Sequence, residues 1–227
     1  MEPDTNTNAE GFSLTGLKRP DVITSLTRQR AIFVRDASNS MSENNKARDA
    51  SRATQNFLAE LAKPENKDGF YVAVIDYSDD ATIVAPFAKA TELEGTLEDI
   101  ETRINTNITA GLKKARKLLE DTPDPIDSKE RFLKPVVILF SDGCHNEGPK
   151  PHKAAEELKV IADLITVAFG SDADENLLRE IATTPEHCYR CQDGKDLRAF
   201  MAAVGDTLTT TMMRGEDATQ PLGEIGR

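Results

Sequence analysis

Residues 31–40 read AIFVRDASNS, and this stretch decides how the chain folds. An apolar, strand-like run at 31–34 leads into an Asp-x-Ser-x-Ser motif whose polar residues are Asp36, Ser38 and Ser40. A short loop at the end of a buried strand can direct one carboxylate and two hydroxyls at a single point. All three groups are hard oxygen ligands, which suit a small divalent cation such as Mg²⁺.

Strand and helix patterns alternate along most of the chain. Two continuous apolar runs, at 135–140 and 164–169, are typical of parallel strands that are covered on both faces. Residues 71–77 and 81–87 predict two strands joined by a tight turn, the second being an antiparallel edge strand. A last strand is expected at 187–191, and helices are expected at 42–61 (with Ser42 as N-cap), 96–104, 107–120, 153–161, 175–182 and 197–212. This alternation predicts a doubly wound α/β fold with a mostly parallel central sheet and helices on both faces.

Two further oxygen ligands are expected at the same end of the sheet. Thr106 precedes the amphipathic helix at 107–120, and Asp142 follows the strand at 135–140. In open α/β sheets, ligands bind beyond the carboxyl ends of the strands, where the strand order switches. Taken alone, Asp36 and the two serines could merely cap the following helix. With Thr106 and Asp142 at matching ends of other elements, a metal site is the better interpretation.

This set of residues resembles the von Willebrand factor type A (vWA) family, whose metal-ion-dependent adhesion site uses an Asp-x-Ser-x-Ser run, a Thr and an Asp in this order. The resemblance covers about 29–212 and includes the strand and helix pattern at 167–181. It implies a vWA-type, Rossmann-like fold. It also implies the roles of the ligands: direct metal ligation by the hydroxyls of the two serines and the threonine, and direct or water-mediated ligation by the two aspartates (Asp36, Ser38, Ser40, Thr106 and Asp142).

Two positions depart from the family pattern. Asn39 stands where a glycine is often found, and Asn tolerates left-handed backbone. Arg35 places a charge where the strand is usually apolar. We also expect Asp36 to be a ligand on a surface loop and not a core residue.

The resemblance implies a non-catalytic protein-interaction module. Mg²⁺ or Mn²⁺ (with Ca²⁺ as a further candidate) would bind a Glu or Asp that a partner protein supplies. Among vWA proteins the chain looks like the bacterial TerY-type, stand-alone group, which implies a setting in stress or tellurite resistance and kinase or phosphatase partners. Two alternatives remain open: a metal-dependent phosphohydrolase on the same fold, and a scaffold whose site no longer binds metal. The first is disfavoured because the chain has no Gly-x-Ser-x-Gly elbow, and His145 alone among the histidines follows a predicted strand end.

The composition narrows the class of partner and the compartment. The formal net charge is −11, from 39 acidic and 28 basic residues, which argues against nucleic acid and anionic membranes as partners. No apolar run reaches 18 residues, so we expect no membrane span. The first eight residues lack the features of a secretory signal, and three cysteines without a framework spacing favour a reducing compartment. We therefore expect a cytoplasmic protein.

The pair Cys188 and Cys191 has the spacing of a redox or zinc motif. On a strand, however, residues three apart face opposite sides of the sheet, so the two sulfurs would not converge. We interpret both as ordinary strand cysteines. The charged run at 113–117 is interpreted as a solvated helix face, with a docking surface as the alternative.

The domain organisation expected from these patterns is simple. Residues 1–28 form an N-terminal arm, 29–212 form the vWA domain, and 213–227 form a flexible C-terminal tail.

Overall fold

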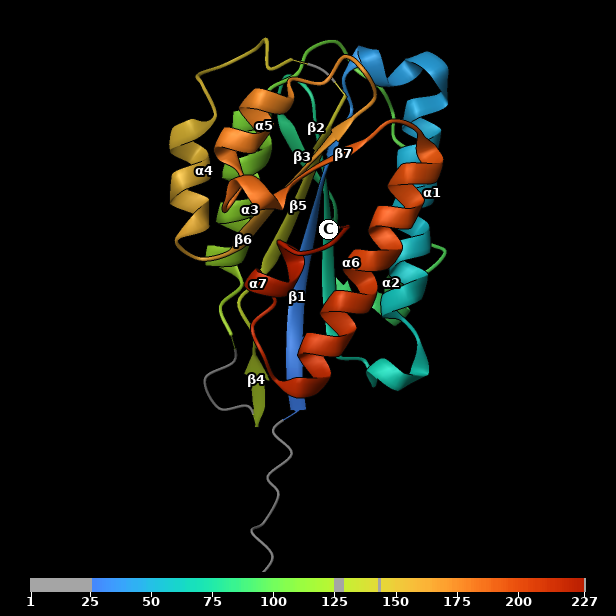
Figure 1. The fold of residues 1–227 in the computed structure, drawn as a ribbon, viewed down its shortest axis with the longest axis vertical. Helices are drawn as coiled ribbons and strands as arrows, with labels where there is room; N and C mark the ends of the chain where they lie inside the picture. The colour runs from blue at the N-terminus through green and yellow to red at the C-terminus, as the bar shows by residue number, and fades with distance from the viewer. Residues whose placement is uncertain (1–25, 125–128, 143, 227) are drawn as a thin grey trace, which may run out of the picture.

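A seven-stranded sheet forms the centre of the computed structural model, which describes residues 26–124, 129–142 and 144–226 (Figure 1). The strand order is β3-β2-β1-β5-β6-β7, and β4 pairs with the beginning of β1. All pairs are parallel except β2 and β3, which are antiparallel. The bounds are β1 Leu26–Asp36, β2 Phe70–Tyr77, β3 Ala81–Lys89, β4 Glu130–Phe132, β5 Val136–Ser141, β6 Asp163–Phe169 and β7 Cys188–Cys191. This is the predicted doubly wound α/β fold.

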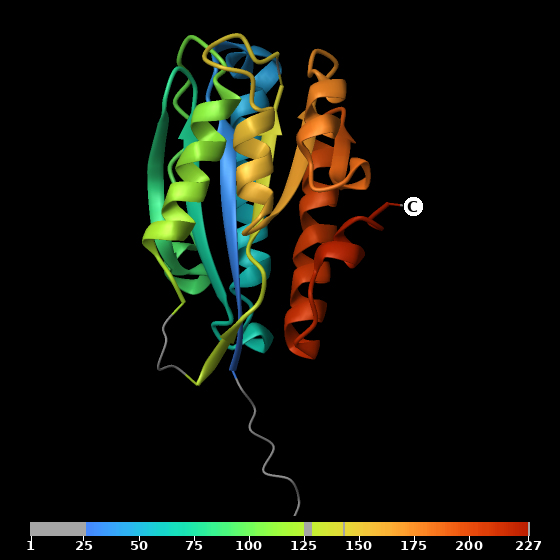
Figure 2. The ribbon, with the colours of Figure 1, turned by 90° about the vertical axis from the view of Figure 1, so that its left-hand side faces the viewer.

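Helices cover both faces of the sheet. One face carries α1 (Lys46–Leu61), α2 (Ala90–Leu93), α6 (Gly194–Arg214) and α7 (Thr219–Leu222). The other carries α3 (Ile108–Asp121), α4 (His152–Lys159) and α5 (Glu175–Ile181). Figure 2 shows α3 and α4 side by side over the strands. Three short 3-10 helices complete the described fold: η1 Asn39–Asn45, η2 Pro64–Asn66 and η3 Pro185–His187.

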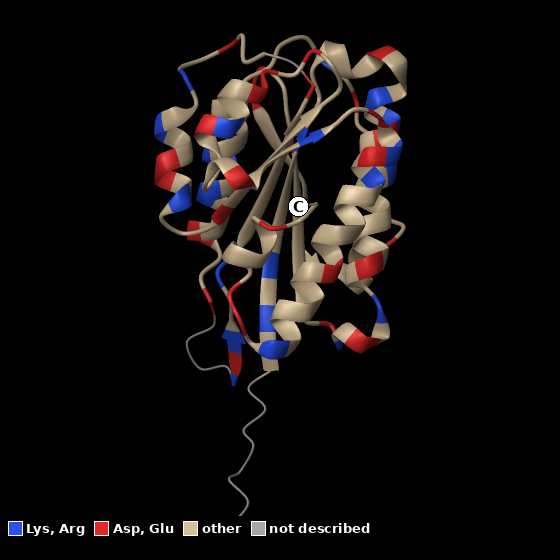
Figure 3. Ribbon diagram, viewed as in Figure 1, with Lys and Arg blue, Asp and Glu red and all other residues tan. Residues whose placement is uncertain are grey.

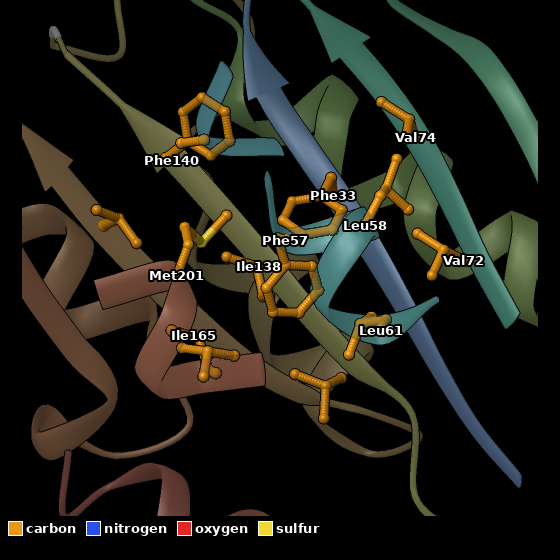
Figure 4. Close-up of a cluster of buried hydrophobic side chains, with 14 of the residues drawn as sticks. Phe33, Phe57, Leu58, Leu61, Val72, Val74, Ile138, Phe140, Ile165 and Met201 are labelled. Atoms are coloured by element: carbon orange, nitrogen blue, oxygen red, sulfur yellow. The ribbon is translucent and has the colours of Figure 1, made fainter. Parts of the chain in front are cut away.

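Two apolar clusters, one on each face, form the core. Alternation along β1 sends Phe33 to one cluster and Ile32 and Val34 to the other, and all three are fully buried. In Figure 4, Phe33 lies among side chains of α1 such as Phe57, and the two rings meet edge to face at 4.9 Å between centroids. Burial on both faces explains why the central strands read as continuous apolar runs.

Helix α1 begins later than the pattern predicts. Residues 39–45 form η1, and Asn44 and Asn45 have left-handed backbone, with φ of 51° and 61°, just before Lys46 begins the α-helix. Ser42 is therefore not an N-cap, and its Oγ donates to the carbonyl oxygen of Asn39 instead. Asn39 itself has no positive φ, so the left-handed residues of this loop lie further along the chain than expected.

The predicted helix at 96–104 is wrong. Helix α2 ends at Leu93, Gly95 has a φ of +73°, and an irregular segment follows. Its apolar residues Leu97 and Ile100 are buried, and the Ile100 N–H donates to Ser51 Oγ of α1 at 3.0 Å. Packing of an extended segment on α1 has overridden a helical pattern in which apolar residues are few. The short strand β4 was also not predicted.

The two ends of the chain differ from their expected organisation in different ways. Most of the expected N-terminal arm lies outside the described residues, and its last three residues begin β1. The expected flexible tail is folded where it is described: α7 packs against the core through Ala218 and Leu222, which are buried. The Tyr189 hydroxyl donates to the carbonyl oxygen of Leu222, which anchors this helix to β7.

Basic and acidic residues are interspersed along the outer helices, as the blue and red segments of the ribbon show (Figure 3). None of the helices in the described part of the chain is both long and apolar enough to cross a bilayer.

Candidate metal centre

Four of the five predicted ligands are connected by hydrogen bonds in one chain. The Ser38 backbone N–H donates to Asp36 Oδ1 at 2.8 Å, and the hydroxyl oxygens of Ser38 and Ser40 lie 3.0 Å apart. The Ser40 hydroxyl donates to Asp142 Oδ1 at 2.7 Å. Residues that are about a hundred positions apart in sequence thus meet at one point.

The sheet register explains this meeting. Asp36 is the last residue of β1, and Asp142 directly follows β5. Because Arg35 is paired with Phe140, the next residues of the two strands, Asp36 and Ser141, lie side by side. The Ser141 hydroxyl donates to Asp36 Oδ2 at 2.7 Å. Strand β1 has β2 on one side and β5 on the other, so the site lies where the strand order switches, at the upper end of the sheet in Figure 1.

Asp36 is a core residue, which corrects the expectation of a surface-loop ligand. Its side chain is fully buried, and Oδ2 accepts from Ser141 and, at 3.2 Å, from the Tyr77 hydroxyl. Burial raises the pKa of the Asp36 carboxyl. Hydrogen bonds from Ser38 and Ser141 oppose this rise, whereas the nearby negative charge of Asp142 adds to it. A cation beside Asp36 would favour its ionised form.

Tyr77, the last residue of β2, contacts the site from the side of the sheet core. Its hydroxyl donates to Asp36 Oδ2 and lies 3.3 Å from the carbonyl oxygen of Phe140. Burial, with the charge of Asp36 as the second cause, holds the pKa of Tyr77 well above its ordinary value. The phenol therefore stays protonated and acts as a hydrogen-bond donor to the carboxylate.

Thr106 lies beside the loop that follows Asp142 but has no hydrogen bond to the other four predicted ligands. Its backbone N–H donates to Asn146 Oδ1 at 2.9 Å, and its carbonyl oxygen accepts from the Asn146 N–H at 3.1 Å. The side chain is buried. Helix α3 starts two residues later, where Asn107 is the N-cap and its side chain accepts from the Ala110 N–H.

Arg35, the charge that departs from the family pattern, is buried and paired. Its Nε and one terminal nitrogen donate to the two carboxylate oxygens of Asp76, at 2.6 and 3.0 Å. Asp76 is directly opposite on β2, so the pair is set by the register. This fork-like pair allows a guanidinium next to the site without adding net charge there.

Sequence reasoning missed three residues that contact the predicted ligands: Ser141, Tyr77 and Lys46. The Lys46 ammonium lies 2.7 Å from Asp142 Oδ2. Ser141 and Tyr77 are the last residues of strands, and this position was a usable signal. Lys46 lies within a predicted helix, and nothing in the sequence pattern shows that it reaches back to Asp142.

The donor set fits a small divalent ion. The oxygen separations of 2.7 to 3.0 Å match the edge of an octahedron with metal–oxygen bonds of about 2.1 Å, which is about 3 Å. Within the described ranges, no three His, Cys, Asp or Glu side chains are grouped as a metal site, so an ion here would depend on hydroxyl ligands. Few direct anionic ligands and several neutral oxygens are characteristic of an ion that keeps water in its coordination shell.

Comparison with known families agrees with this geometry. The family described as the von Willebrand factor type A domain matches residues 32–203, which include every predicted ligand and most of the sheet. The chain belongs to this family. Domains of the von Willebrand factor type A family are generally protein-interaction or adhesion modules.

Several solved structures share the fold of this vWA domain. Proximal thread matrix protein 1 of the mussel byssus, in a form with a zinc-occupied MIDAS motif, has a TM-score of 0.66 and 24% identity, over 83% of this chain and 47% of that chain. The pilus adhesin SpaC of Lactobacillus rhamnosus GG has a TM-score of 0.67 and 14% identity, over 82% and 30%. The conserved hypothetical protein BatB of Bacteroides thetaiotaomicron has a TM-score of 0.61 and 17% identity, over 80% and 98%.

These likenesses establish the fold alone, because all the identities are below 25%. The vWA domain spans about half of the mussel protein and less than a third of the pilus adhesin, whereas it matches nearly all of BatB. No curated protein sequence matches the chain.

Proposed function

We propose that this vWA domain is a non-catalytic recognition module that binds an acidic residue of a partner protein through a divalent ion. The ligands would be Asp36, Ser38, Ser40, Thr106 and Asp142, and Mg²⁺ or Mn²⁺ is the expected ion, with Ca²⁺ as a further candidate. The ion would supply an electrophilic position at which a Glu or Asp of the partner replaces a bound water.

One observation carries the proposal: the hydroxyls of Ser38 and Ser40 and the Asp142 carboxylate converge at octahedral-edge distances, beside a buried Asp36. A helix cap would not need this arrangement. The first helical turn after the motif receives no side-chain cap bond from Ser38, so the capping interpretation of the motif finds no support in these contacts.

The chain's own residues prepare the site in two ways. Ser141 and Tyr77 hold Oδ2 of Asp36 by hydrogen bonds, which leaves the carboxylate one orientation. Ser40 holds Oδ1 of Asp142. A preorganised set of ligands lowers the cost of ordering when an ion binds.

The charges around the site favour one direction for the partner. A hollow of about 120 Å³ on the β2 and β3 side is lined by the acidic residues Asp76, Glu98, Asp99 and Glu101, with Arg103. A groove of about 390 Å³ between α3 and α4 is lined by Lys113, Lys150 and Lys153, with Glu157. An acidic partner segment that reaches the ion would therefore lie over the α3–α4 side.

The hydrolase alternative is disfavoured by the environment of the histidine nearest the site. Nδ1 of His145 accepts from the Ile108 N–H at 3.2 Å, and Nε2 lies 3.1 Å from the carbonyl oxygen of Pro149. Both nitrogens are thus used in holding a loop to the start of α3. The chain contains one Asp-x-Asp sequence, but Asp174 caps α5 by accepting from the Leu177 N–H, and Asp172 has an exposed side chain.

The wider setting of the proposal rests on resemblance and on the fold neighbours. The mussel protein with a zinc-occupied MIDAS motif supports metal binding by a vWA domain of this shape. The resemblance to TerY-type proteins supports a cytoplasmic role in bacterial stress or tellurite resistance, with kinase or phosphatase partners.

The metal part of the proposal is tested by titrating the purified protein with Mn²⁺ in a calorimeter. Wild type is expected to bind one ion, and Ser38→Ala and Thr106→Ala are each expected to weaken binding about ten- to a hundredfold, since each removes one neutral ligand without changing charge. Thr109→Ala is the matched control, because the Thr109 hydroxyl donates to the carbonyl oxygen of Pro149 and points to the α3–α4 groove. Wild-type protein that takes up no Mn²⁺ would overturn the proposal.

The partner part is tested by capture from host lysate on immobilised protein, in Mg²⁺ or in EDTA. A protein retained in Mg²⁺ and released by EDTA, and not retained by Thr106→Ala, supports recognition through the ion. Equal retention in EDTA would place the binding surface away from the ion, for example in the lysine-lined groove between α3 and α4.

A further inference from the structure

Lys46 is a buried lysine beside the candidate metal centre, and the ligand set leaves it without a role. It is the first residue of α1 and is only 8% exposed. Its Nζ lies 2.7 Å from Asp142 Oδ2 and 3.8 Å from Asp172 Oδ2. A lysine that is buried at this level is uncommon unless a partner holds it.

Two separate features of the backbone lead Lys46 to Asp142. The left-handed residues Asn44 and Asn45 turn the chain sharply between η1 and α1, so that the helix starts beside the site. At the end of β6, Gly170 has a φ of +89°, and a Cβ there would lie 3.3 Å from Cε and 3.5 Å from Nζ of Lys46. Because Gly170 has no side chain, there is space beside it for the aliphatic part of Lys46.

The ammonium group changes the charge balance of the centre. Asp142 uses Oδ1 to accept from Ser40 and Oδ2 to accept from Lys46. With Asp36 and Asp142 ionised, Lys46 leaves a formal charge of about −1 where two carboxylates alone would give −2. A divalent ion attracted by Asp142 is also repelled by the ammonium a few ångströms away.

Asp172 is a second ion-pair partner for the Lys46 ammonium. Its side chain is 71% exposed and lies in the segment after β6, while Asp142 is fully buried. The distance of 3.8 Å is a weak contact in this arrangement and would become a close one after a small rotation of the lysine end. Both acceptors are therefore within reach of one flexible side chain.

We propose that Lys46 is an internal counter-ion that holds Asp142 when no metal is bound and moves toward Asp172 when a divalent ion binds. This inference rests on the proposed metal function and deepens it. Lys46 then lowers metal affinity while keeping the metal-free centre ordered, and Asp172 favours the metal-bound arrangement.

The experiment is a Mn²⁺ titration of four proteins: wild type, Lys46→Met, Asp172→Asn and the double variant. Lys46→Met keeps the length of the stem but removes the charge, so Mn²⁺ should bind about tenfold more tightly. Asp172→Asn should weaken binding about threefold, on the order of half a decade in affinity. In the Lys46→Met background, Asp172→Asn should have no effect, because the group through which it acts is gone.

Two matched controls separate this role from general effects of charge and stability. Lys134 pairs with the buried Asp163 at 2.6 Å at the opposite end of the sheet, so Lys134→Met removes a comparable ion pair away from the metal. Asp80 has a 78% exposed side chain, pairs with Arg103 and lies in the turn after β2, so Asp80→Asn removes an acid with similar exposure. Neither Lys134→Met nor Asp80→Asn should alter the factor by which Lys46→Met changes the Mn²⁺ affinity. The effect of each control on Mn²⁺ affinity should be independent of the residue at position 46.

A second readout is the melting temperature, measured first without metal and then with it. In EDTA, Lys46→Met should lower the melting temperature, because Asp142 Oδ2 loses its partner in a buried place. Saturating Mn²⁺ should then raise the melting temperature of Lys46→Met by more than it raises that of wild type. Lys134→Met should also melt earlier in EDTA but should gain no more from Mn²⁺ than wild type does.

The outcomes distinguish the inference from the function on which it rests. If wild type binds no Mn²⁺, both fall. If wild type binds Mn²⁺ and folded Lys46→Met binds it equally or more weakly, the metal site stands and the counter-ion role is overturned. If Lys46→Met folds, a loss of affinity from Asp172→Asn that persists in the double variant also overturns the inference. If Lys46→Met does not fold, the single variant Asp172→Asn decides, and unchanged Mn²⁺ affinity in that variant overturns the inference.

Discussion

At the scale of single residues, Asp36 is a buried acid whose neighbours satisfy its carboxylate. It is fully buried at the end of the central strand, and it accepts hydrogen bonds from the Ser38 N–H, the Ser141 hydroxyl and the Tyr77 hydroxyl. Replacing it with alanine would remove an acceptor from three buried donors. The amide of asparagine keeps one acceptor and the shape of the side chain, so it is the better test of charge.

We predict that Asp36→Asn folds normally and loses Mn²⁺ binding by more than about a hundredfold. The carboxylate charge is lost, while most of the surrounding contacts remain. In EDTA its melting temperature should equal or exceed that of wild type, because burial raises the pKa of this carboxyl and an uncharged amide avoids that penalty. Calorimetric titration and thermal circular dichroism measure the two effects.

Asp163→Asn is the control for Asp36→Asn, since Asp163 is equally buried but begins β6 at the other end of the sheet. It should be destabilised through its bonds to Lys134 and Thr219, yet bind Mn²⁺ as wild type does. Wild-type Mn²⁺ affinity in folded Asp36→Asn would exclude Asp36 from the metal site.

The cysteines of β7 lead to a second prediction. As expected for strand residues three apart, Cys191 packs in one core cluster and Cys188 against the other. Burial raises the pKa of Cys191 from 9.0 to about 12. At pH 8, a thiol reagent such as DTNB should therefore react quickly with the exposed Cys144 and with Cys191 only after unfolding.

The same shift has a defined sign for stability. The neutral Cys191 thiol favours the folded state fully below pH 9, where the unfolded thiol is also neutral, and this contribution is lost as pH rises from 9 toward about 12. Cys144→Ser should abolish the fast phase of the DTNB reaction in the native protein. A fast phase that survives when both Cys144 and the half-buried Cys188 are replaced by serine would contradict the burial of Cys191.

The residues of the centre also mark the limit of what sequence can predict. Asp36, Ser38 and Ser40 could be predicted because they are contiguous with an apolar strand, and Asp142 because it follows another. Lys46 could not, because its contact with Asp142 depends on two left-handed asparagines and on a glycine about 125 positions away. Such contacts are set by the path of the backbone, and no local pattern encodes them.

At the scale of elements, α3, which begins two residues after Thr106, packs closely against the sheet. Gly111 lies on the buried face of α3, and a Cβ there would be 2.8 Å from Cγ1 of Val34 and 3.2 Å from the ring of Tyr77. Only a residue without a side chain lets the helix come this close.

We predict that Gly111→Ala destabilises the protein by about 1–3 kcal/mol, although alanine has the higher helix propensity, because the added methyl forces α3 away from β1 and β2. The free energy of unfolding in urea measures this loss. Lys113→Ala on the outer face of the same helix should change stability by less than about 0.5 kcal/mol. A Gly111→Ala variant as stable as wild type would show that α3 can shift freely.

Elements with strong periodicity or continuous apolar runs were predicted well, and weak ones were not. The helix predicted at 107–120 is confirmed to within one residue at each end, because its apolar stripe is strong; Asn107, expected as its first residue, is its N-cap. The segment 96–104 has few apolar residues, and Leu97 and Ile100 are buried without helix formation because α1 offers them a surface and a hydroxyl partner. Tertiary contacts decide such segments.

At the scale of the whole molecule, the last described helix is part of the core. Leu222 of α7 is fully buried, the Tyr189 hydroxyl donates to its carbonyl oxygen, and the Thr219 hydroxyl donates to Asp163 at 2.5 Å. The segment thereby joins β6, β7 and the surface of α6.

We predict that Leu222→Ala lowers the free energy of unfolding by about 2–5 kcal/mol, the usual cost of truncating a buried leucine. Urea unfolding with circular dichroism measures it, and the exposed Gln220→Ala is the control. Stability equal to wild type would mean that the end of the chain is a dispensable tail, as the sequence pattern suggested.

The edge strand β3 has a consequence for the behaviour of the protein at high concentration. Ile83 and Val84 are partly exposed on this edge, which on its own invites a strand of another molecule to pair with it. Pro86 lacks an N–H, and the pairing of β3 with β2 shifts register twice near Val74, so the outer edge is neither flat nor able to donate regularly. These irregularities disfavour the growth of a continuous intermolecular sheet from this side, so the domain can expose apolar edge residues at a lower risk of aggregation.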